Sequence, residues 1–147
     1  MKAEFPRALK VDAIEPYRLR IHWSTGEILD VDIAGHLRGN RALLHVLDRD
    51  IFLRAHADEH GRAIEWIDSE LGADNVYAWT REQMGEASHE MFFAWMTKNS
   101  LNVETTAQAL GMSRRMIAYY RSGAKPIPKH VWLACIGYDQ LKKLHAA

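Results

Sequence analysis

A stretch of twenty residues, 103–122, constrains the fold of this 147-residue chain more than any other segment. It reads V-E-T-T-A-Q-A-L-G-M-S-R-R-M-I-A-Y-Y-R-S. Ala107 is small enough for two helices to cross closely, and Gly111 can take the positive φ that ends a helix. Ser113 can cap the next helix through its hydroxyl. The spacing therefore predicts two helices joined by a tight turn, a helix-turn-helix.

Helical periodicity continues on both sides of this segment. Four apolar residues between 91 and 96 fall on one face of a helix. Asn102 could cap a second helix and Ser113 a third. Pro128 stands near a first-turn position and opens a fourth helix. We therefore expect residues 85–147 to form an all-α domain of four to five helices.

The third of these helices has an apolar and a polar side. Ile117 and Tyr120 are spaced to point inward, and Leu110 and Met112 belong to the same small core. The opposite face could reach the major groove of a duplex once Ser113 sets the start of the helix. This outward face comprises Arg114, Arg115, Ala118, Tyr119 and Ser122.

The distribution of charge points in the same direction. The formal net charge of the chain is zero, but residues 1–87 hold 11 Lys and Arg against 16 Asp and Glu, a net charge of −5. Residues 88–147 hold 8 Lys and Arg against 3 Asp and Glu, a net charge of +5. Such a division is expected when only one part of a chain meets a polyanion. Five basic residues cluster on or just after the third helix: Arg114, Arg115, Arg121, Lys125 and Lys129.

A resemblance to a known family rests on the stretch T-T-A-Q-A-L-G-M-S-R-R-M-I-A-Y-Y-R-S-G-A-K-P-I-P. It resembles the lambda-repressor-like, Cro-type helix-turn-helix family, over about residues 88–144. Thr106 and Arg121 depart from the family pattern, which usually has an apolar and an acidic residue there. The resemblance implies that the base-reading positions are Arg114, Arg115 and Tyr119. It implies that the phosphate-contacting positions are Asn102, Ser122 and Lys125.

These six residues, together with the cap residue Ser113 and with Ala118 of the outward face, make up the predicted DNA-binding set. A helical hairpin of this kind can also serve only as a packing module, because a fold does not dictate a function. The basic cluster argues against that alternative, since it would supply the salt-dependent part of DNA affinity.

The first part of the chain reads as β structure. Tyr17, Leu19, Ile21 and Trp23 alternate with polar residues, the pattern of a half-buried strand. The tripeptide S-T-G then supplies a turn, and an apolar series continues through residues 28–33. A preceding strand near residues 9–14 would complete a three-stranded sheet.

The elements after this hairpin are shorter. Residues 35–40 are typical of a loop or short turn, residues 43–47 suggest a short helix, and residues 48–50 a turn. A further strand near residues 64–67 would pair with residues 52–57. We therefore expect residues 1–84 to form an α+β domain with a small antiparallel sheet, a hairpin and short helices.

A second resemblance concerns this N-terminal part. The segments P-R-A-L-K-V, Y-R-L-R-I-H-W-S-T-G-E-I-L-D-V-D-I, L-D-R-D-I-F-L-R-A and A-I-E-W resemble the bacterial domain of unknown function 2442 family, over about residues 5–79. Members of that family often occur near toxin-antitoxin genes, so the resemblance implies a regulator or an antitoxin. Phosphate repulsion would keep an acidic domain off DNA, so we expect it to face a protein. Dimerisation through a sheet edge and docking of a partner both remain open.

The sequence also offers three candidate chemical sites, and the signal for each is weaker than the signal for DNA binding. His56 and His60 have the spacing of two metal ligands on a helix, but the neighbouring Gly61 and turn-like residues spoil that helix, so we expect no metal site. Cys135 stands in an apolar helix without a base nearby, and we expect a buried, inert thiol. Trp66 and Trp79 are expected in the core. We therefore expect neither catalytic residues nor a cofactor, and not an enzyme.

Location follows from hydropathy and cysteine usage. No apolar run approaches the roughly 18 to 20 residues that span a bilayer. Residues 1–14 alternate charged with apolar side chains, and a single cysteine excludes an internal disulfide. We therefore expect a cytoplasmic bacterial protein with no membrane partner.

Two hypotheses follow. The first is a homodimeric transcriptional regulator whose third helix binds the major groove of double-stranded DNA, with half-sites about 34 Å apart. The second is a protein-binding module, either an antitoxin that binds a toxin-like partner through the N-terminal domain or an adaptor that has lost contact with DNA.

Overall fold

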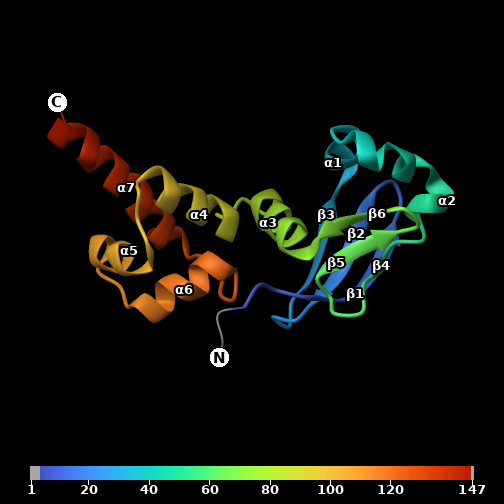
Figure 1. The fold of residues 1–147 in the computed structure, drawn as a ribbon, viewed down its shortest axis with the longest axis horizontal. Helices are drawn as coiled ribbons and strands as arrows, with labels where there is room; N and C mark the ends of the chain where they lie inside the picture. Colours follow the sequence, from blue (N-terminus) through green and yellow to red (C-terminus); the bar gives the residue numbers. More distant parts are fainter. Residues whose placement is uncertain (1–3, 147) are drawn as a thin grey trace. The chain divides into compact units, whose positions relative to one another are not determined.

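Two compact units make up the part of the chain that the computed structural model describes, residues 4–146 (Figure 1). Residues 6–83 form one unit, which we call the α+β unit. Residues 84–146, together with residues 4 and 5, form the other, the helical unit. Each unit has its own cluster of buried apolar side chains.

The first three strands of the α+β unit form an antiparallel sheet in the order β1-β2-β3. Their bounds are Ala8–Ile14, Arg18–Trp23 and Ile28–Asp32. Leu19, Ile21 and Trp23 of β2 are buried. Arg18 and Arg20, which alternate with them, are exposed, and His22 is half-buried. The predicted hairpin, its preceding strand and the alternation of its side chains are therefore confirmed.

A second antiparallel sheet has the order β4-β5-β6. The bounds of these strands are His56–Ala57, Ala63–Trp66 and Ser69–Gly72. β5 confirms the predicted strand near residues 64–67. Its partner β4 is much shorter than the predicted 52–57, because Phe52 belongs to a helix and is buried in the core. β6 was not predicted.

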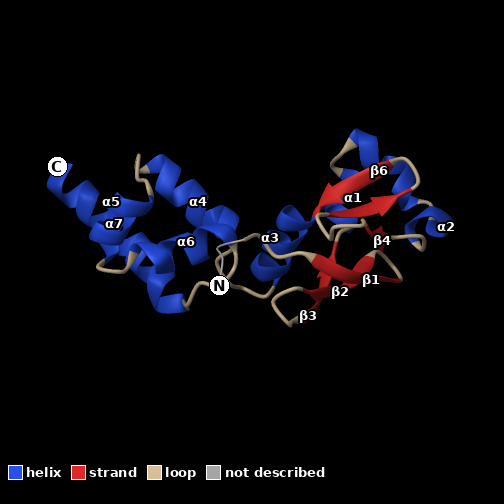
Figure 2. Ribbon diagram, turned by 60° about the horizontal axis from the view of Figure 1, so that its bottom comes forward, coloured by secondary structure: helices blue, strands red, loops and turns tan. Residues whose placement is uncertain are grey.

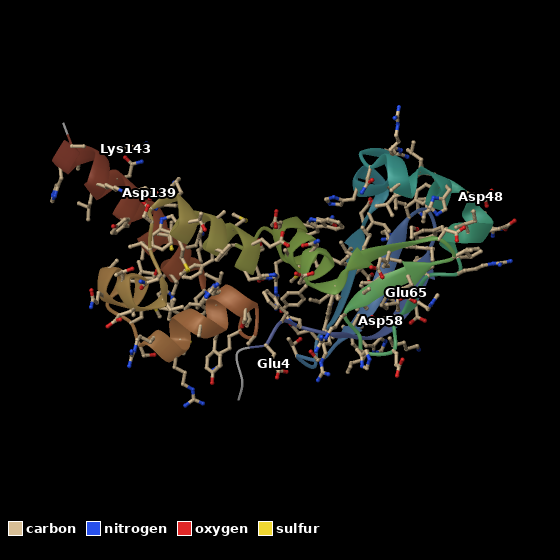
Figure 3. All side chains as sticks on the ribbon, in the orientation of Figure 1. Glu4, Asp48, Asp58, Glu65, Asp139 and Lys143 are labelled. Atoms are coloured by element: carbon tan, nitrogen blue, oxygen red, sulfur yellow. The ribbon has the colours of Figure 1, made fainter. Side chains whose placement is uncertain are left out.

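Three short helical segments connect the two sheets. They are α1 (Ala34–Arg38), the 3-10 helix η1 (Arg41–Leu47) and α2 (Arg49–Phe52). The loop or short turn predicted over residues 35–40 is wrong for residues 35–38, which belong to α1 and bury Leu37. In η1, Leu43 and Val46 are both buried, which agrees with the three-residue period of a 3-10 helix. The Asp48 carboxylate, labelled in Figure 3, accepts the Asp50 N–H (2.9 Å) and caps α2.

The last helix of the unit, α3 (Ala73–Gln83), packs on β3, β5 and β6. It was missed from the sequence because two polar residues, Thr80 and Arg81, stand on its buried side. The Gln83 carboxamide bonds the backbone of Asp32, accepting its N–H (2.9 Å) and donating to its C=O (2.8 Å). These two bonds occupy the backbone groups at the end of edge strand β3.

One glycine joins the two sheets. The Ala8 N–H donates to the Gly61 C=O (2.8 Å). Gly61 has a φ of +71°, and a Cβ there would lie 2.6 Å from the Ala8 carbonyl oxygen. No other residue fits this close approach.

The described residues of the helical unit contain helices and loops but no strand (Figure 2). Ser88 caps the first helix through a bond from the Met91 N–H (3.1 Å). The core beneath the helices contains Phe92, Met96 and Cys135, all fully buried. Four to five helices were predicted here, and the described residues of this unit contain four: α4 (His89–Lys98), α5 (Val103–Leu110), α6 (Arg114–Ser122) and α7 (Lys129–Ala146).

Candidate nucleic-acid interface

The turn between α5 and α6 is fixed by its backbone and by one side chain. Gly111 has a φ of +67°, and the Met112 N–H donates to the Ala107 C=O (2.9 Å). The Ser113 hydroxyl accepts the Met116 N–H (3.1 Å). The positive φ predicted at Gly111 and the cap predicted at Ser113 are both confirmed. The glycine conformation and the serine cap together fix the residue at which α6 begins and the direction of α6 relative to α5.

A capping box opens α5. The Asn102 carboxamide oxygen accepts the Thr105 N–H (2.8 Å), and the Thr105 hydroxyl accepts the Asn102 N–H (2.9 Å). Asn102 is exposed, and its amide nitrogen has no hydrogen-bond partner within residues 4–146. That nitrogen remains a donor for an external acceptor such as a phosphate oxygen.

The inward side of α6 agrees with the prediction. Ile117 and Tyr120 are buried, and the Tyr120 ring makes an edge-to-face contact with Phe92 on α4, with centroids 6.0 Å apart. Leu110 and Met112 are partly buried against the same cluster. This packing fixes which face of α6 points away from the core.

Two arginines stand exposed at the start of α6. Arg114 and Arg115 are both on the surface, and Ala118, one turn further, is half-buried. Within the described residues, no carboxylate forms an ion pair with Arg114, Arg115 or Lys125. The exposed Arg114 and Arg115, with the half-buried Lys125 from the turn after α6, form a positive edge that has no counter-charge among the described residues.

Tyr119 was predicted to lie open on this face, and that is wrong, since the residue is only 4% exposed. Its hydroxyl accepts a hydrogen bond from Arg115 Nε (2.7 Å). The Arg115 guanidinium and the Lys125 ammonium both lie against the ring, at 5.5 and 4.8 Å from its centroid. Helical spacing placed Tyr119 on the correct side of α6, but it could not show that these cations would cover the ring.

Ser122 was predicted to contact phosphates, and the structure gives it another role. It is buried, its hydroxyl donates to the Tyr119 C=O (3.2 Å), and its oxygen accepts the Ala124 N–H (3.2 Å). The side chain therefore closes the turn after α6. Lys125, in the same turn, is half-buried with its ammonium near Tyr119.

Arg121 stands where the helix-turn-helix pattern that the sequence resembles usually has an acidic residue, and here it contacts an aromatic ring. Its guanidinium lies over the Phe93 ring, 5.0 Å from the centroid. This cation–π contact ties α6 to α4, on which α6 packs.

Sequence reasoning missed Asp139 of α7, labelled in Figure 3. The carboxylate accepts hydrogen bonds from Trp95 Nε1 (3.1 Å), Asn99 Nδ2 (3.0 Å) and Lys98 Nζ (2.7 Å). Burial would raise its pKa, but these donors outweigh burial and hold the pKa of Asp139 below its ordinary value. Asp139 therefore anchors α7 to the end of α4. A lone acid within an apolar helix was its only signal in the sequence.

The other candidate sites are dispersed. His56 lies in β4 rather than on a helix, with Nε2 3.3 Å from the Glu65 carboxylate, and His60 lies in the following turn. Cys135 is fully buried, and burial raises the pKa of its thiol to about 12. Trp66 is a core residue whose Nε1 donates to the Phe52 C=O (3.1 Å).

Trp79 is only partly buried and stacks on His36, with ring centroids 3.5 Å apart. This contact joins α3 to α1 at the margin of the α+β core. The prediction that Trp79 belongs to the core is therefore correct only in part.

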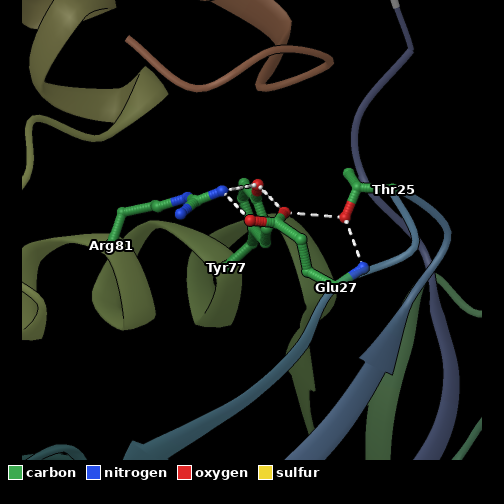
Figure 4. A network of polar contacts seen from close by, with 4 residues as sticks. All are labelled: Thr25, Glu27, Tyr77 and Arg81. Atoms are coloured by element: carbon green, nitrogen blue, oxygen red, sulfur yellow. Dashed lines mark hydrogen bonds and ion pairs between the residues drawn. The ribbon is translucent and has the colours of Figure 1, made fainter. Parts of the chain in front are cut away.

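A polar network in the α+β unit also escaped the sequence analysis (Figure 4). Arg81 forms an ion pair with Glu27 and donates from Nη2 to the Tyr77 hydroxyl (2.9 Å). The Tyr77 hydroxyl donates in turn to Glu27 (2.7 Å), as does the Thr25 hydroxyl (2.7 Å). Because Glu27 lies in the turn between β2 and β3, the network ties that turn to α3.

Comparison with known proteins gives two matches. A protein-family profile described as "Protein of unknown function (DUF2442)" matches residues 8–82, which confirms the resemblance of the N-terminal part. A crystal structure described as "Putative DNA Binding Protein NE0471 from Nitrosomonas europaea ATCC 19718" is 51% identical in sequence. That match covers 95% of this chain and 90% of the other, with a TM-score of 0.88.

No protein with a curated description matches the chain. Within residues 4–146, no helix has both the length and the apolar character needed to cross a membrane.

Proposed function

The chain belongs to the DUF2442 family, and from that premise we propose that it binds specific sequences of double-stranded DNA through its helical unit. In this proposal α5 and α6 form a Cro-type helix-turn-helix, and α6 enters the major groove. The protein then acts as a transcriptional regulator, through binding rather than catalysis.

One observation carries the proposal: the exposed positive edge of α6 has no acidic partner within the described residues. A cationic surface of this kind supplies the electrostatic part of DNA affinity through release of counterions from the duplex. The similar protein from Nitrosomonas europaea, described as a "Putative DNA Binding Protein", supports the same interpretation, since it matches this chain over nearly its whole length.

Base reading is assigned to the start of α6. Arg114 and Arg115 follow the Ser113 cap directly, so their side chains stand at the helix end that meets the base edges in this class of motif. A guanidinium matches the O6 and N7 acceptors of guanine. Ala118, one turn further, is small enough to let the helix approach the groove.

Phosphate contact is assigned to residues outside α6. The exposed amide nitrogen of Asn102 and the ammonium of Lys125 are the donors. We further propose that two copies bind together, because a single recognition helix reads only a few base pairs. The preferred site is then an approximate palindrome with half-sites about 34 Å apart.

The test is selection of bound duplexes from a random DNA pool, followed by affinity measurement on the selected duplex and on a scrambled one. Arg114→Ala or Arg115→Ala is expected to cost roughly 1 to 3 kcal/mol on the selected duplex and to relax its sequence preference. Lys125→Ala is expected to lower the affinity for the selected and the scrambled duplex by the same factor. Arg38→Ala is the matched control, since Arg38 is an exposed cation on α1 of the α+β unit.

Two results would contradict the proposal. One is a random pool that yields no enriched sequence. The other is that Arg114→Ala and Arg115→Ala each lose as much affinity for the scrambled duplex as for the selected one, while the Arg38→Ala control loses none, which would show that α6 reads no bases.

A further inference from the structure

We propose that Tyr119 is a positioning residue, which holds Arg115 so that the two terminal nitrogens of its guanidinium read one guanine. The inference rests on the proposed function and gives it a residue-level mechanism. It replaces the sequence-based expectation that Tyr119 itself reads a base.

The contact between the two side chains has a defined geometry. Arg115 and Tyr119 are four residues apart on α6, so their side chains lie on the same face of the helix. Arg115 Nε donates to the Tyr119 hydroxyl at 2.7 Å, and its Cζ lies 5.5 Å from the ring centroid. The guanidinium is thus held both by a hydrogen bond and by the face of the ring.

The tyrosine is itself fixed, which a positioning residue requires. The residue is only 4% exposed. The Lys125 ammonium lies 4.8 Å from its ring centroid, and the Ser122 hydroxyl bonds its backbone carbonyl (3.2 Å). An anchored ring restricts the rotamers of the arginine that lies against it.

The hydrogen bond also selects which edge of the guanidinium faces outward. With Nε occupied, the pair of terminal nitrogens, Nη1 and Nη2, is the edge that remains for a bidentate contact. Within residues 4–146 neither of these nitrogens has a polar partner. Two parallel N–H donors match the O6 and N7 acceptors of guanine.

The neighbouring arginine provides an internal contrast. Arg114 is exposed and forms no hydrogen bond, ion pair or ring contact within the described residues. Its side chain must be ordered when DNA binds, whereas most of that ordering is already present for Arg115. The entropy lost on ordering one long side chain lowers the binding affinity by a factor of roughly three to ten.

The experiment compares wild-type protein with Tyr119→Phe, which keeps the ring and removes the hydroxyl. Affinity is measured on the selected duplex, on the scrambled duplex, and on duplexes in which each G·C pair is changed in turn. Tyr119→Phe is expected to lose roughly three- to tenfold in affinity for the selected duplex. Its affinity for the scrambled duplex is expected to stay unchanged, and its preference for one guanine to fall.

A double-mutant cycle separates positioning from general stability. In the Arg115→Ala background, Tyr119→Phe is expected to have no further effect, because the side chain that it positions is gone. A loss as large as in wild type, or an equal loss on selected and scrambled duplexes, would overturn the inference.

A second measurement needs no change at Tyr119. In the free wild-type protein, NMR of the arginine Nε–H groups is expected to show a slowly exchanging signal for Arg115, and a rapidly exchanging one for Arg114. Equal exchange of the two signals would overturn the inference.

The two proposals fail in different ways. If the wild-type protein binds no duplex, the proposed function fails and the inference falls with it. If Arg115→Ala loses the guanine preference while Tyr119→Phe keeps it, the inference alone is wrong.

Discussion

Both units contain an arginine and a tyrosine four residues apart on one helix, and they use the pair differently. In α3, Arg81 bonds the Tyr77 hydroxyl and forms an ion pair with Glu27. In α6, Arg115 bonds the Tyr119 hydroxyl, but its remaining nitrogens meet no acceptor within residues 4–146. Both helices therefore have an arginine bonded to a tyrosine hydroxyl, but only the arginine of α3 also has a carboxylate as its counter-charge.

This difference separates a structural arginine from one that is available for binding. Arg81 is buried, and its charge is satisfied within the unit. Arg115 is exposed and satisfied only in part. A guanidinium that a tyrosine orients but no carboxylate neutralises is suited to an anionic or acceptor-rich partner from outside the chain.

The largest expected effect concerns the buried member of this comparison. Arg81→Met leaves the Glu27 carboxylate without its ion partner, and it is expected to lower the free energy of unfolding by about 2 to 4 kcal/mol. Arg115→Ala, on the exposed helix face, is expected to change it by less than about 0.5 kcal/mol. Chemical denaturation measures both. If both variants lost the same free energy of unfolding, the distinction between a structural Arg81 and an available Arg115 would be wrong.

A smaller effect is expected in the pH dependence of stability. Burial would raise the pKa of the Glu27 carboxyl, but hydrogen bonds from Thr25 and Tyr77 and the charge of Arg81 outweigh it and hold the pKa below its ordinary value. The carboxylate therefore stabilises the folded state above its ordinary pKa, and this contribution is lost as pH falls through the lowered folded value.

Glu27→Gln keeps the shape of the side chain and removes its titration. Denaturation at a series of pH values between neutral and acid conditions is expected to show a shallower loss of stability for this variant than for wild type. Arg115→Ala serves as the control, with a wild-type pH profile. An unaltered profile for Glu27→Gln would contradict the role assigned to the network.

The smallest expected effect compares two buried threonines. The Thr80 hydroxyl in α3 donates to the Val76 C=O (2.7 Å). The Thr106 hydroxyl in α5, equally buried, has no hydrogen-bond partner within the described residues. Thr106→Val is expected to raise the free energy of unfolding by about 1 kcal/mol, and Thr80→Val to lower it by about 1 kcal/mol. Thermal or chemical denaturation of both variants shows whether the two changes in the free energy of unfolding have opposite signs. A Thr106→Val protein that is less stable than wild type would contradict the prediction.

Strong local signals made parts of the fold predictable from sequence. A glycine that permits a positive φ and a serine that caps a helix depend on a few neighbouring residues, so the turn between α5 and α6 was predictable. The alternation of apolar and polar residues along β2 likewise predicted a strand with one buried face. In α3, by contrast, Arg81 and Thr80 are buried through partners that only the folded chain brings near. A helix with polar residues on its inner face loses its periodic signal.

The candidate site shows the same limit. Charge and helical spacing were sufficient to predict that Arg114 and Arg115 are exposed. They were not sufficient for Tyr119, whose ring lies against Arg115 and Lys125, or for Ser122, whose hydroxyl bonds the turn that follows α6. Spacing gives the direction of a side chain, whereas its exposure depends on what tertiary contacts place over it.

The central claim is that the positive edge of α6 takes its counter-charge from DNA. The most direct test is the dependence of affinity on salt concentration, measured on the selected duplex for wild type, Lys125→Ala and Arg38→Ala. We expect log affinity of the wild type to fall linearly with log salt. Lys125→Ala is expected to make that slope shallower by about one, and Arg38→Ala to leave it unchanged. A wild-type affinity that does not depend on salt would contradict the account.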